Sequence, residues 1–134
     1  YDNSPFSVLE LDSGGGRIDS AQSIGDFVVK NQIEVHVNGT CASACVIVAL
    51  RARRLLALPE ADFGFHRGSA IADTDSELGR FAGRTATLEM FKELRKGGIP
   101  DEILQVGQET SADSMYYVTG QKLHAAGVVD ALIE

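Results

Sequence analysis

Residues 7–16 read Ser-Val-Leu-Glu-Leu-Asp-Ser-Gly-Gly-Gly, and the glycine turn that ends this stretch is one of the most informative features of the sequence. The segment from Ser7 to Leu11 is short, mostly apolar and followed by turn-forming residues, which predicts a strand that ends at the glycines. Glycine provides the positive φ angles that a sharp turn after a strand requires. Three glycines in a row are more than a turn needs, so the turn is also a candidate for the close approach of a substrate carbonyl.

Outward from this turn, predicted strands and helices alternate along the whole chain. This alternation implies a layered α/β fold. No repeat, low-complexity stretch or linker divides residues 1–134, so we expect a single domain. The predicted strands span residues 7–11, 33–37, 54–58, 63–66 and 115–118, and the predicted helices begin at Asp19 or Ser20, Ala42, Asp75 or Ser76, Pro100 and Thr119.

Two of these helices have apolar residues at helical spacing, and we expect those residues to face the core. The helix that begins near residue 76 is the longer of the two, and Gly97-Gly98 is predicted to end it. The predicted core residues are Ala21, Ile24, Phe27 and Val28 in the first helix, and Leu78, Phe81, Ala82, Leu88, Phe91 and Leu94 in the longer one.

Composition and charge exclude several classes of function. The chain has 134 residues, 44% of them hydrophobic, which is enough for one domain with a core. Its net charge of −7 argues against binding to nucleic acid or to anionic lipid, because both require a basic surface. No apolar run approaches the roughly 20 residues that a membrane-spanning helix needs.

Two cysteines, Cys41 and Cys45, lie four residues apart. The ends of one helical turn rarely have the geometry of a disulfide, so we expect two small buried apolar residues instead. A zinc site would need further ligands, and the three histidines are widely separated in the sequence. The sequence therefore predicts neither a metal nor another cofactor, and it leaves the redox compartment open.

Ser43 and His66 complete a pattern that suits acyl transfer. Ser43 lies among small residues at the start of a predicted buried helix, and His66 follows a short predicted strand. Such a serine is often only a helix cap, and a lone histidine is more often structural than catalytic. Acyl transfer by a serine, however, needs a base and backbone N–H groups that hold the oxyanion. The order of glycine turn, serine and histidine matches these needs.

In this order the sequence resembles the Clp protease proteolytic subunit and the wider ClpP/crotonase superfamily. The family's Ser-Pro-Gly-Gly turn corresponds to Ser13-Gly14-Gly15-Gly16, in which Gly14 replaces the proline. The segment before the nucleophile corresponds to Gly39-Thr40-Cys41-Ala42-Ser43, and the family's closing Gly-Leu-Val-Asp corresponds to Gly127-Val128-Val129-Asp130. The resemblance extends from about Val8 to Ile133.

The resemblance implies a ClpP/crotonase-like spiral of ββα units that lacks the family's first strand and helix. It implies Ser43 as nucleophile, His66 as base, and the N–H groups of Gly16 and Ala44 as the oxyanion hole. The family's acidic position falls near residue 115, so Asp113 is the expected orienting carboxylate, with Glu109 as a weaker choice.

The implied activity is that of a serine peptidase-like hydrolase without a cofactor. The alternatives are a catalytically inactive ClpP-like scaffold that binds a peptide or protein partner and, ranked last, a coenzyme A thioester enzyme of the crotonase branch. The expected partners are a peptide or protein substrate and further copies of the chain. The Cys-Ala-Ser-Ala-Cys form resembles stand-alone, often exported relatives more than the ATPase-coupled subunit, which leaves both periplasm and cytoplasm open.

Overall fold

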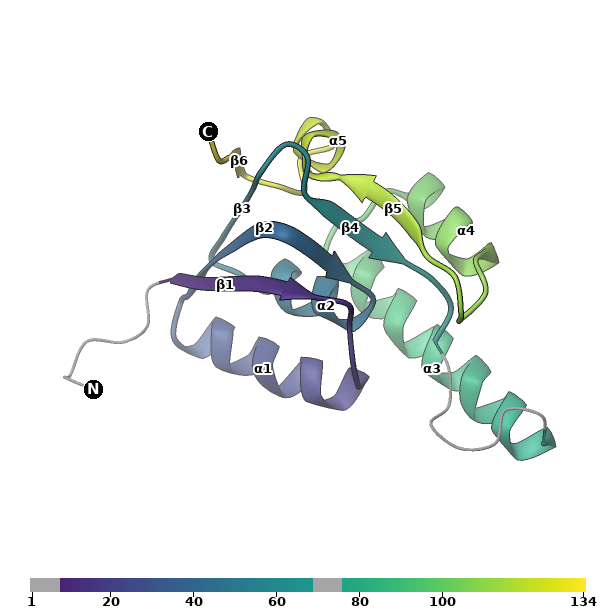
Figure 1. The fold of residues 1–134 in the computed structure, drawn as a ribbon. Coiled ribbons are helices and arrows are strands. Elements are labelled where there is room, and N and C mark those ends of the chain that lie inside the picture. The colour runs from purple at the N-terminus through teal and green to yellow at the C-terminus, as the bar shows by residue number, and fades with distance from the viewer. Residues whose placement is uncertain (1–7, 69–75) are drawn as a thin grey trace.

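The computed structural model describes residues 8–68 and 76–134, which form one mixed sheet with five helices (Figure 1). The sheet order is β5-β4-β2-β3-β6, and β1 pairs with β2. The strands are β1 (Val8–Ser13), β2 (Glu34–Ala42), β3 (Arg54–Ala57), β4 (Asp62–Phe65), β5 (Tyr116–Thr119) and β6 (Ala131–Leu132). The helices are α1 (Ile18–Lys30), α2 (Ala44–Leu50), α3 (Glu77–Lys96), α4 (Asp101–Glu109) and α5 (Gly120–Ala125).

Strand β2 is the centre of the sheet. It pairs in parallel with β1, β3 and β4, whereas β4 and β5 are antiparallel. The register places Cys41 of β2 opposite both Ser13 of β1 and Phe63 of β4. Because β1, β2 and β4 run in the same direction, their carboxyl ends meet at one edge of the sheet. The glycine turn, Ser43 and His66 each follow one of these ends, and such edges are where α/β folds place their sites.

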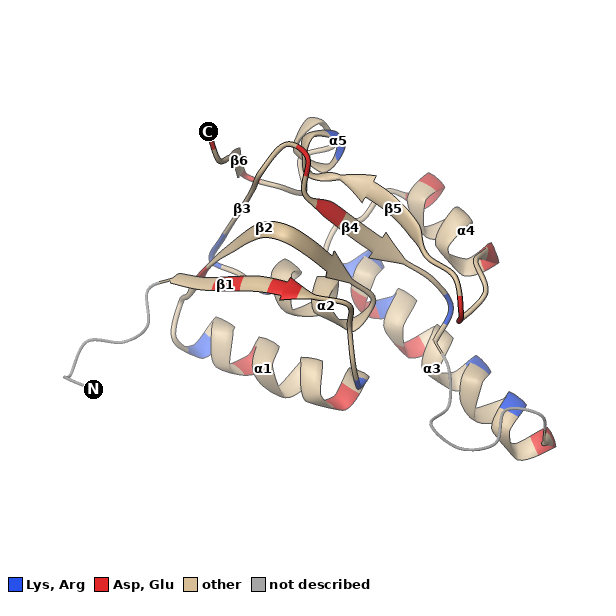
Figure 2. Cartoon of the chain, viewed as in Figure 1, with Lys and Arg blue, Asp and Glu red and all other residues tan. Residues whose placement is uncertain are grey.

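The core lies between the sheet and α1, α2 and α3. Val35 and Val37 alternate toward it from β2, and residues 44–49 of α2 are all buried. Among the described residues, no polar or charged residue is buried. Figure 2 accordingly shows the charged residues along the helices and on the strands at the outside of the sheet.

The apolar face predicted for α1 is wrong in two positions. Ile24 and Phe27 are each 47% exposed, and the buried stripe consists of Ala21, Gly25 and Val28. The cause is the close approach of the chain that follows α2, because a Cβ at Gly25 would lie 3.0 Å from the Arg51 side chain. Small residues therefore define the buried face.

The predicted core face of α3 is right only in the last turns of the helix. Phe91 and Leu94 are buried together with Met90, whereas Leu78 and Leu88 are 77% and 73% exposed. For Leu78, near the start of α3, the reason is that the first half of the helix extends beyond the sheet (Figure 1). Leu88 lies outside the buried stripe of the second half.

Most helix boundaries follow the predicted signals. The Ser76 hydroxyl caps α3 by accepting a hydrogen bond from the Gly79 N–H, and the Thr119 hydroxyl caps α5 in the same way. Asp75, the other predicted cap of α3, lies outside the described residues. Helix α1 begins earlier than predicted: its N-cap is Arg17, whose side chain makes no capping hydrogen bond, rather than Asp19 or Ser20. Within the described ranges, no helix is long and apolar enough to cross a membrane.

Strand β2 is longer than the sequence predicts, and this difference positions the site. The strand continues from residue 37 to Ala42, and α2 begins at Ala44 rather than at residue 42. Ser43 is therefore the single residue between a strand and a helix. Strand β6 was also not predicted, because two residues carry no periodic signal.

Candidate active site

Ser43 forms a sharp turn between β2 and α2. Its φ of 58° and ψ of −125° lie in a region that non-glycine residues rarely adopt, at a cost of about 1–3 kcal/mol. Its N–H donates to the Gly64 carbonyl at 2.8 Å, and its carbonyl accepts from the Val46 N–H at 3.0 Å. A strained serine at a strand-to-helix turn presents its Oγ outward from the sheet, as it does in the α/β-hydrolase fold.

Gly15, the middle glycine of the turn, lies directly against Ser43. Gly15 has a φ of +115°, and a Cβ there would lie 2.8 Å from Ser43 Cβ and 3.0 Å from the Ala42 carbonyl oxygen. Gly14 and Gly16, in contrast, have open space where a Cβ would be. The glycine that the structure requires is therefore Gly15, which the sequence did not distinguish from its neighbours.

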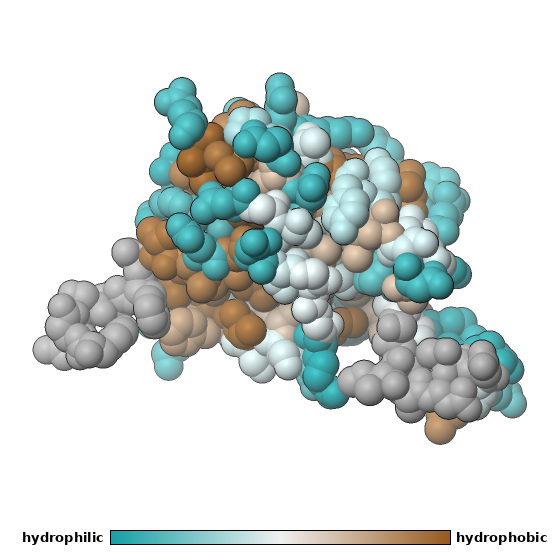
Figure 3. All heavy atoms as spheres, viewed as in Figure 1, coloured by the Kyte–Doolittle hydropathy of each residue, from teal (hydrophilic) through white to brown (hydrophobic). Residues whose placement is uncertain are grey.

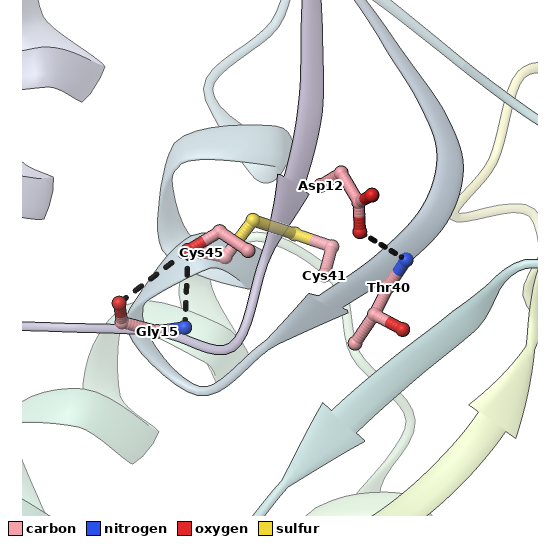
Figure 4. Close-up of a disulfide and its surroundings, with 6 residues drawn as sticks. Asp12, Gly15, Thr40, Cys41 and Cys45 are labelled. Atoms are coloured by element: carbon pink, nitrogen blue, oxygen red, sulfur yellow. Dashed lines mark hydrogen bonds between the residues drawn. A yellow bond between two sulfur atoms is a disulfide. The ribbon is translucent and has the colours of Figure 1, made fainter.

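The two cysteines form a disulfide, contrary to the expectation of two free buried thiols (Figure 4). The expectation placed both residues on one helical turn. Cys41 is instead in β2, Cys45 is in α2, and the chain reverses at Ser43 between them. The reversal brings their Cα atoms to 5.2 Å, which is within the range that disulfides require.

His66 follows β4 and contacts Ser43 directly. Its Nε2 lies 2.9 Å from Ser43 Oγ, and its Nδ1 lies 3.0 Å from the backbone carbonyl oxygen of Ser114. A carbonyl can only accept, so Nδ1 carries the hydrogen in this contact. The neutral ring then directs the lone pair of Nε2 toward the Ser43 hydroxyl, which is the arrangement that a general base needs.

The structure does not bring Asp113 to His66. The Asp113 side chain is exposed and accepts a hydrogen bond from the Ser111 hydroxyl. This hydrogen bond, more than the charge of Arg67, holds the pKa of Asp113 below its ordinary value. Glu109, the weaker choice, is an exposed residue at the end of α4. The group that faces Nδ1 is a backbone carbonyl in the predicted segment rather than a carboxylate.

Gly16 and Ala44 each have an N–H group available. Gly16 lies beyond the end of β1, so its N–H is outside the strand ladder, and Ala44 is the first residue of α2. Within the part of the chain that the structure describes, neither N–H donates a hydrogen bond to a protein acceptor. Both are therefore free to donate to a ligand.

A cavity of about 960 Å³ opens beside Ser43 and His66, with Gly14 and Gly16 at its margin. Ser43 Oγ also lies 3.8 Å from the sulfur of Met90, a residue that sequence reasoning missed. The exposed residues Leu78 and Phe81 of α3 line this cavity instead of packing in the core. The apolar wall consists of Ile18, Leu78, Phe81, Ala82, Ala86 and Met90.

Metal ligands do not gather at this site. Within residues 8–68 and 76–134, no three His, Cys, Asp or Glu side chains lie close enough together to hold a metal ion. His36 instead pairs with Glu34, at 2.6 Å between Nε2 and Oε2. This hydrogen bond holds the pKa of Glu34 below its ordinary value.

Apolar residues also gather along the margin of the molecule at β1 (Figure 3). Val8 is exposed, and Leu9 and Leu11 pack against the core from this strand. The outer edge of β1 has no partner strand among the described residues. The margin is therefore an open sheet edge beside the glycine turn.

Comparison with known proteins bears on the fold. No protein-family model and no curated protein matches the sequence. The structure is similar to that of the N165D mutant of ClpP1 from Listeria monocytogenes, with a TM-score of 0.72. The match covers 95% of this chain and 72% of ClpP1, at 17% sequence identity. At this identity the similarity shows the fold alone, and the chain therefore has a ClpP-like fold.

Proposed function

We propose that the chain is a serine hydrolase that cleaves peptide bonds. The observation that carries this proposal is the contact of 2.9 Å between His66 Nε2 and the Oγ of Ser43, whose backbone is held in a strained turn. Strained residues and Ser–His contacts at the wall of a cavity are characteristic of sites that use serine as a nucleophile. The ClpP-like fold supports the same interpretation without establishing an activity.

In the proposed reaction, His66 Nε2 takes the hydroxyl proton as Ser43 Oγ attacks the substrate carbonyl. The N–H groups of Gly16 and Ala44 hold the resulting oxyanion. The protonated His66 then gives its proton to the leaving amine, which leaves an acyl group on Ser43. A water molecule, activated by His66, hydrolyses this ester and regenerates the serine.

The proposed site is a dyad with a backbone orienter rather than a triad. The Ser114 carbonyl selects the tautomer of His66 as a carboxylate would, because it accepts from Nδ1–H. It carries no full negative charge, however, so it stabilises the imidazolium less than a carboxylate does. We therefore expect slower turnover than a complete triad would give.

Labelling with a fluorophosphonate tests the proposal. We expect covalent labelling of the wild-type chain on Ser43, located by peptide mass spectrometry. Ser43→Ala removes the acceptor atom and should abolish labelling, and His66→Gln should slow it by several orders of magnitude because the base is lost. Asp113→Asn serves as the matched control, because the structure places Asp113 outside the contact.

Absence of labelling in the folded wild-type chain would contradict the hydrolase. It would favour the second candidate, a ClpP-like scaffold that binds a peptide without cleaving it. The observation that favours the scaffold is that Asp113 is bonded to Ser111, so that no carboxylate within residues 8–68 and 76–134 is bonded to His66. Binding of peptides to Ser43→Ala, measured by fluorescence anisotropy, would then distinguish a scaffold from an inert fold.

We also propose that the chain associates with further copies of itself. Leu88 of α3 supports this proposal, because it is 73% exposed and does not line the cavity, and large exposed apolar side chains are often covered at interfaces. Light scattering at increasing concentration tests it. A monomer at every concentration would contradict it.

A further inference from the structure

We propose that the Cys41–Cys45 disulfide is a positioning element of the site, which holds Ser43 in the backbone conformation required for attack. The disulfide joins the residues two before and two after Ser43 in the chain, so it closes a small ring around the serine. The inference rests on the proposed function for its effect on catalysis. Its effect on the Ser43 backbone stands independently.

The ring ties together the two arms of the turn. Cys41 is at the end of β2, where it is paired with Ser13 and Phe63, and Cys45 is in the first turn of α2. Both are nearly inaccessible, at 0% and 6% exposure. The two arms are thus anchored in the sheet and in the core, and the covalent bond fixes their separation directly at the serine.

Two other contacts restrain Ser43, and each of them acts on a single group of the residue. The Gly64 carbonyl holds its N–H, and Gly15 prevents its Cβ from moving toward the glycine turn. Neither contact keeps the strand and helix arms together. Without the disulfide, rotation about the Ser43 dihedrals toward an ordinary backbone conformation would relax the strain. That rotation would move Oγ away from His66 Nε2.

The disulfide does not border the cavity. Cys41 and Cys45 are absent from its lining, whereas Ser43 and His66 are part of it. Breaking the bond should therefore change the position of the reacting oxygen more than the binding of substrate. A misplacement of about 1 Å at reacting atoms lowers a rate by up to about 10²-fold. We expect a lower kcat and a nearly unchanged KM.

Reduction provides a clean perturbation, because these are the only two cysteines in the sequence. Dithiothreitol supplies two electrons and two protons, which convert the disulfide to two thiols, and is itself oxidised to a cyclic disulfide. Because the bond is buried, the reduced state is verified by alkylation and mass spectrometry. The variant Cys41→Ala/Cys45→Ala gives the same broken ring without a reductant, and dithiothreitol should have no effect on it.

The first readout is the rate of fluorophosphonate labelling of Ser43. We expect it to fall by about 10-fold to 100-fold in the reduced chain and in the double variant. Val129→Ala is the matched control for stability, because Val129 is buried in the core and lies far along the chain from the turn at Ser43. Its labelling rate should remain that of the wild type as long as the chain is folded.

The second readout is amide hydrogen exchange, which does not depend on activity. The Ser43 N–H is bonded to the Gly64 carbonyl and the Val46 N–H to the Ser43 carbonyl, and both should exchange faster after reduction. The N–H groups of Arg53 and Leu58, which are bonded to the Ile33 and Val37 carbonyls, are the reference and should not change.

Hydrogen exchange tests the positioning role of the disulfide, and labelling tests the proposed hydrolase, so the two proposals can fail separately. Exchange at Ser43 and Val46 that is unchanged, or that rises equally at the reference amides, would overturn the inference. Faster exchange confined to the turn, together with no labelling in any form, would support the inference and contradict the proposed hydrolase. Faster exchange with slower labelling supports both.

Discussion

Ser43 and His66 touch each other, yet the two sides of the site are held in different ways. Ser43 is fixed by the Cys41–Cys45 ring, by the close approach of Gly15 and by a hydrogen bond to Gly64. Among the described residues, the one hydrogen-bond partner of His66 Nδ1 is the carbonyl of Ser114, 48 residues further along the chain. Ser43 thus has several independent restraints, whereas one hydrogen bond orients His66 Nδ1.

The restraints are concentrated on Ser43 rather than on His66. A serine at positive φ is unfavourable by itself, so its surroundings must hold it there. An imidazole at the end of a strand needs only one acceptor to select its tautomer. Substitutions that remove a restraint on Ser43 should therefore lower the rate of labelling or the stability more than a substitution of Asp113 does.

The largest effect is expected from Gly15→Ala. The added Cβ would lie 2.8 Å from Ser43 Cβ, and the positive φ of +115° is itself unfavourable for alanine. We expect labelling of Ser43 to fall by about 10²-fold or more, because the turn and the serine must move apart. Gly14→Ala is the matched control, since open space surrounds that position. Equal labelling rates of the two variants would contradict the supporting role of Gly15.

A somewhat smaller effect is expected on stability when the ring is opened. A disulfide that closes a ring of five residues, from Cys41 to Cys45, stabilises the folded chain by about 2 kcal/mol in the chain-entropy model. Cys41→Ala/Cys45→Ala should lower the free energy of unfolding in urea by about this amount. Dithiothreitol should have the same effect on the wild type and none on the variant. A free energy that does not change would show that the bond restrains the unfolded chain little.

The strain at Ser43 is expected to appear as a difference between two substitutions. Ser43→Gly and Ser43→Ala both remove the hydroxyl, but glycine adopts a φ of 58° without a steric penalty. Ser43→Gly should therefore be more stable than Ser43→Ala by about 1 kcal/mol, measured by urea unfolding. If the alanine variant is the more stable one, the turn is not strained in the folded chain.

The residues of the serine side could be predicted from the sequence because they lie in short segments with a recognisable composition. The turn Ser13–Gly16 and the small residues around Ser43 lie in short segments, and parallel pairing brings them together at one edge. The disulfide was not predicted, because its geometry depends on β2 ending at Ala42 rather than at residue 37. A shift of a few residues in one boundary was enough to change the chemistry of the cysteines.

The histidine side was less predictable because its partner is a backbone atom. Any residue at position 114 provides a carbonyl, so no side-chain pattern marks it. The sequence indicated the segment near residue 115, which contains Ser114, but suggested the carboxylate of Asp113 rather than a carbonyl. The exposed residues of α3 were misassigned for a related reason: helical spacing identifies Leu78 and Phe81 as one apolar face, but it does not distinguish a cavity wall from a core.

The smallest effect is expected from Asp113→Asn, and it tests the histidine side most directly. In a complete triad, converting the carboxylate to an amide lowers kcat by about 10⁴-fold, because the amide favours the wrong tautomer of the histidine. Here the Ser114 carbonyl selects the tautomer, and Asp113 is exposed and bonded to Ser111. We therefore expect a change of no more than about 3-fold in the rate of ester hydrolysis, far below the triad value.

Glu109→Gln is the matched control for Asp113→Asn, because it removes the other exposed carboxylate of the same region. Similar small changes in both variants would agree with a dyad whose base is oriented by the backbone. A loss of several orders of magnitude in Asp113→Asn alone would mean that the carboxylate leaves Ser111 and reaches His66 during turnover. The segment from Ser111 to Ser114 would then have to rearrange on binding substrate, and the one restraint on the histidine would be exchanged for a stronger one.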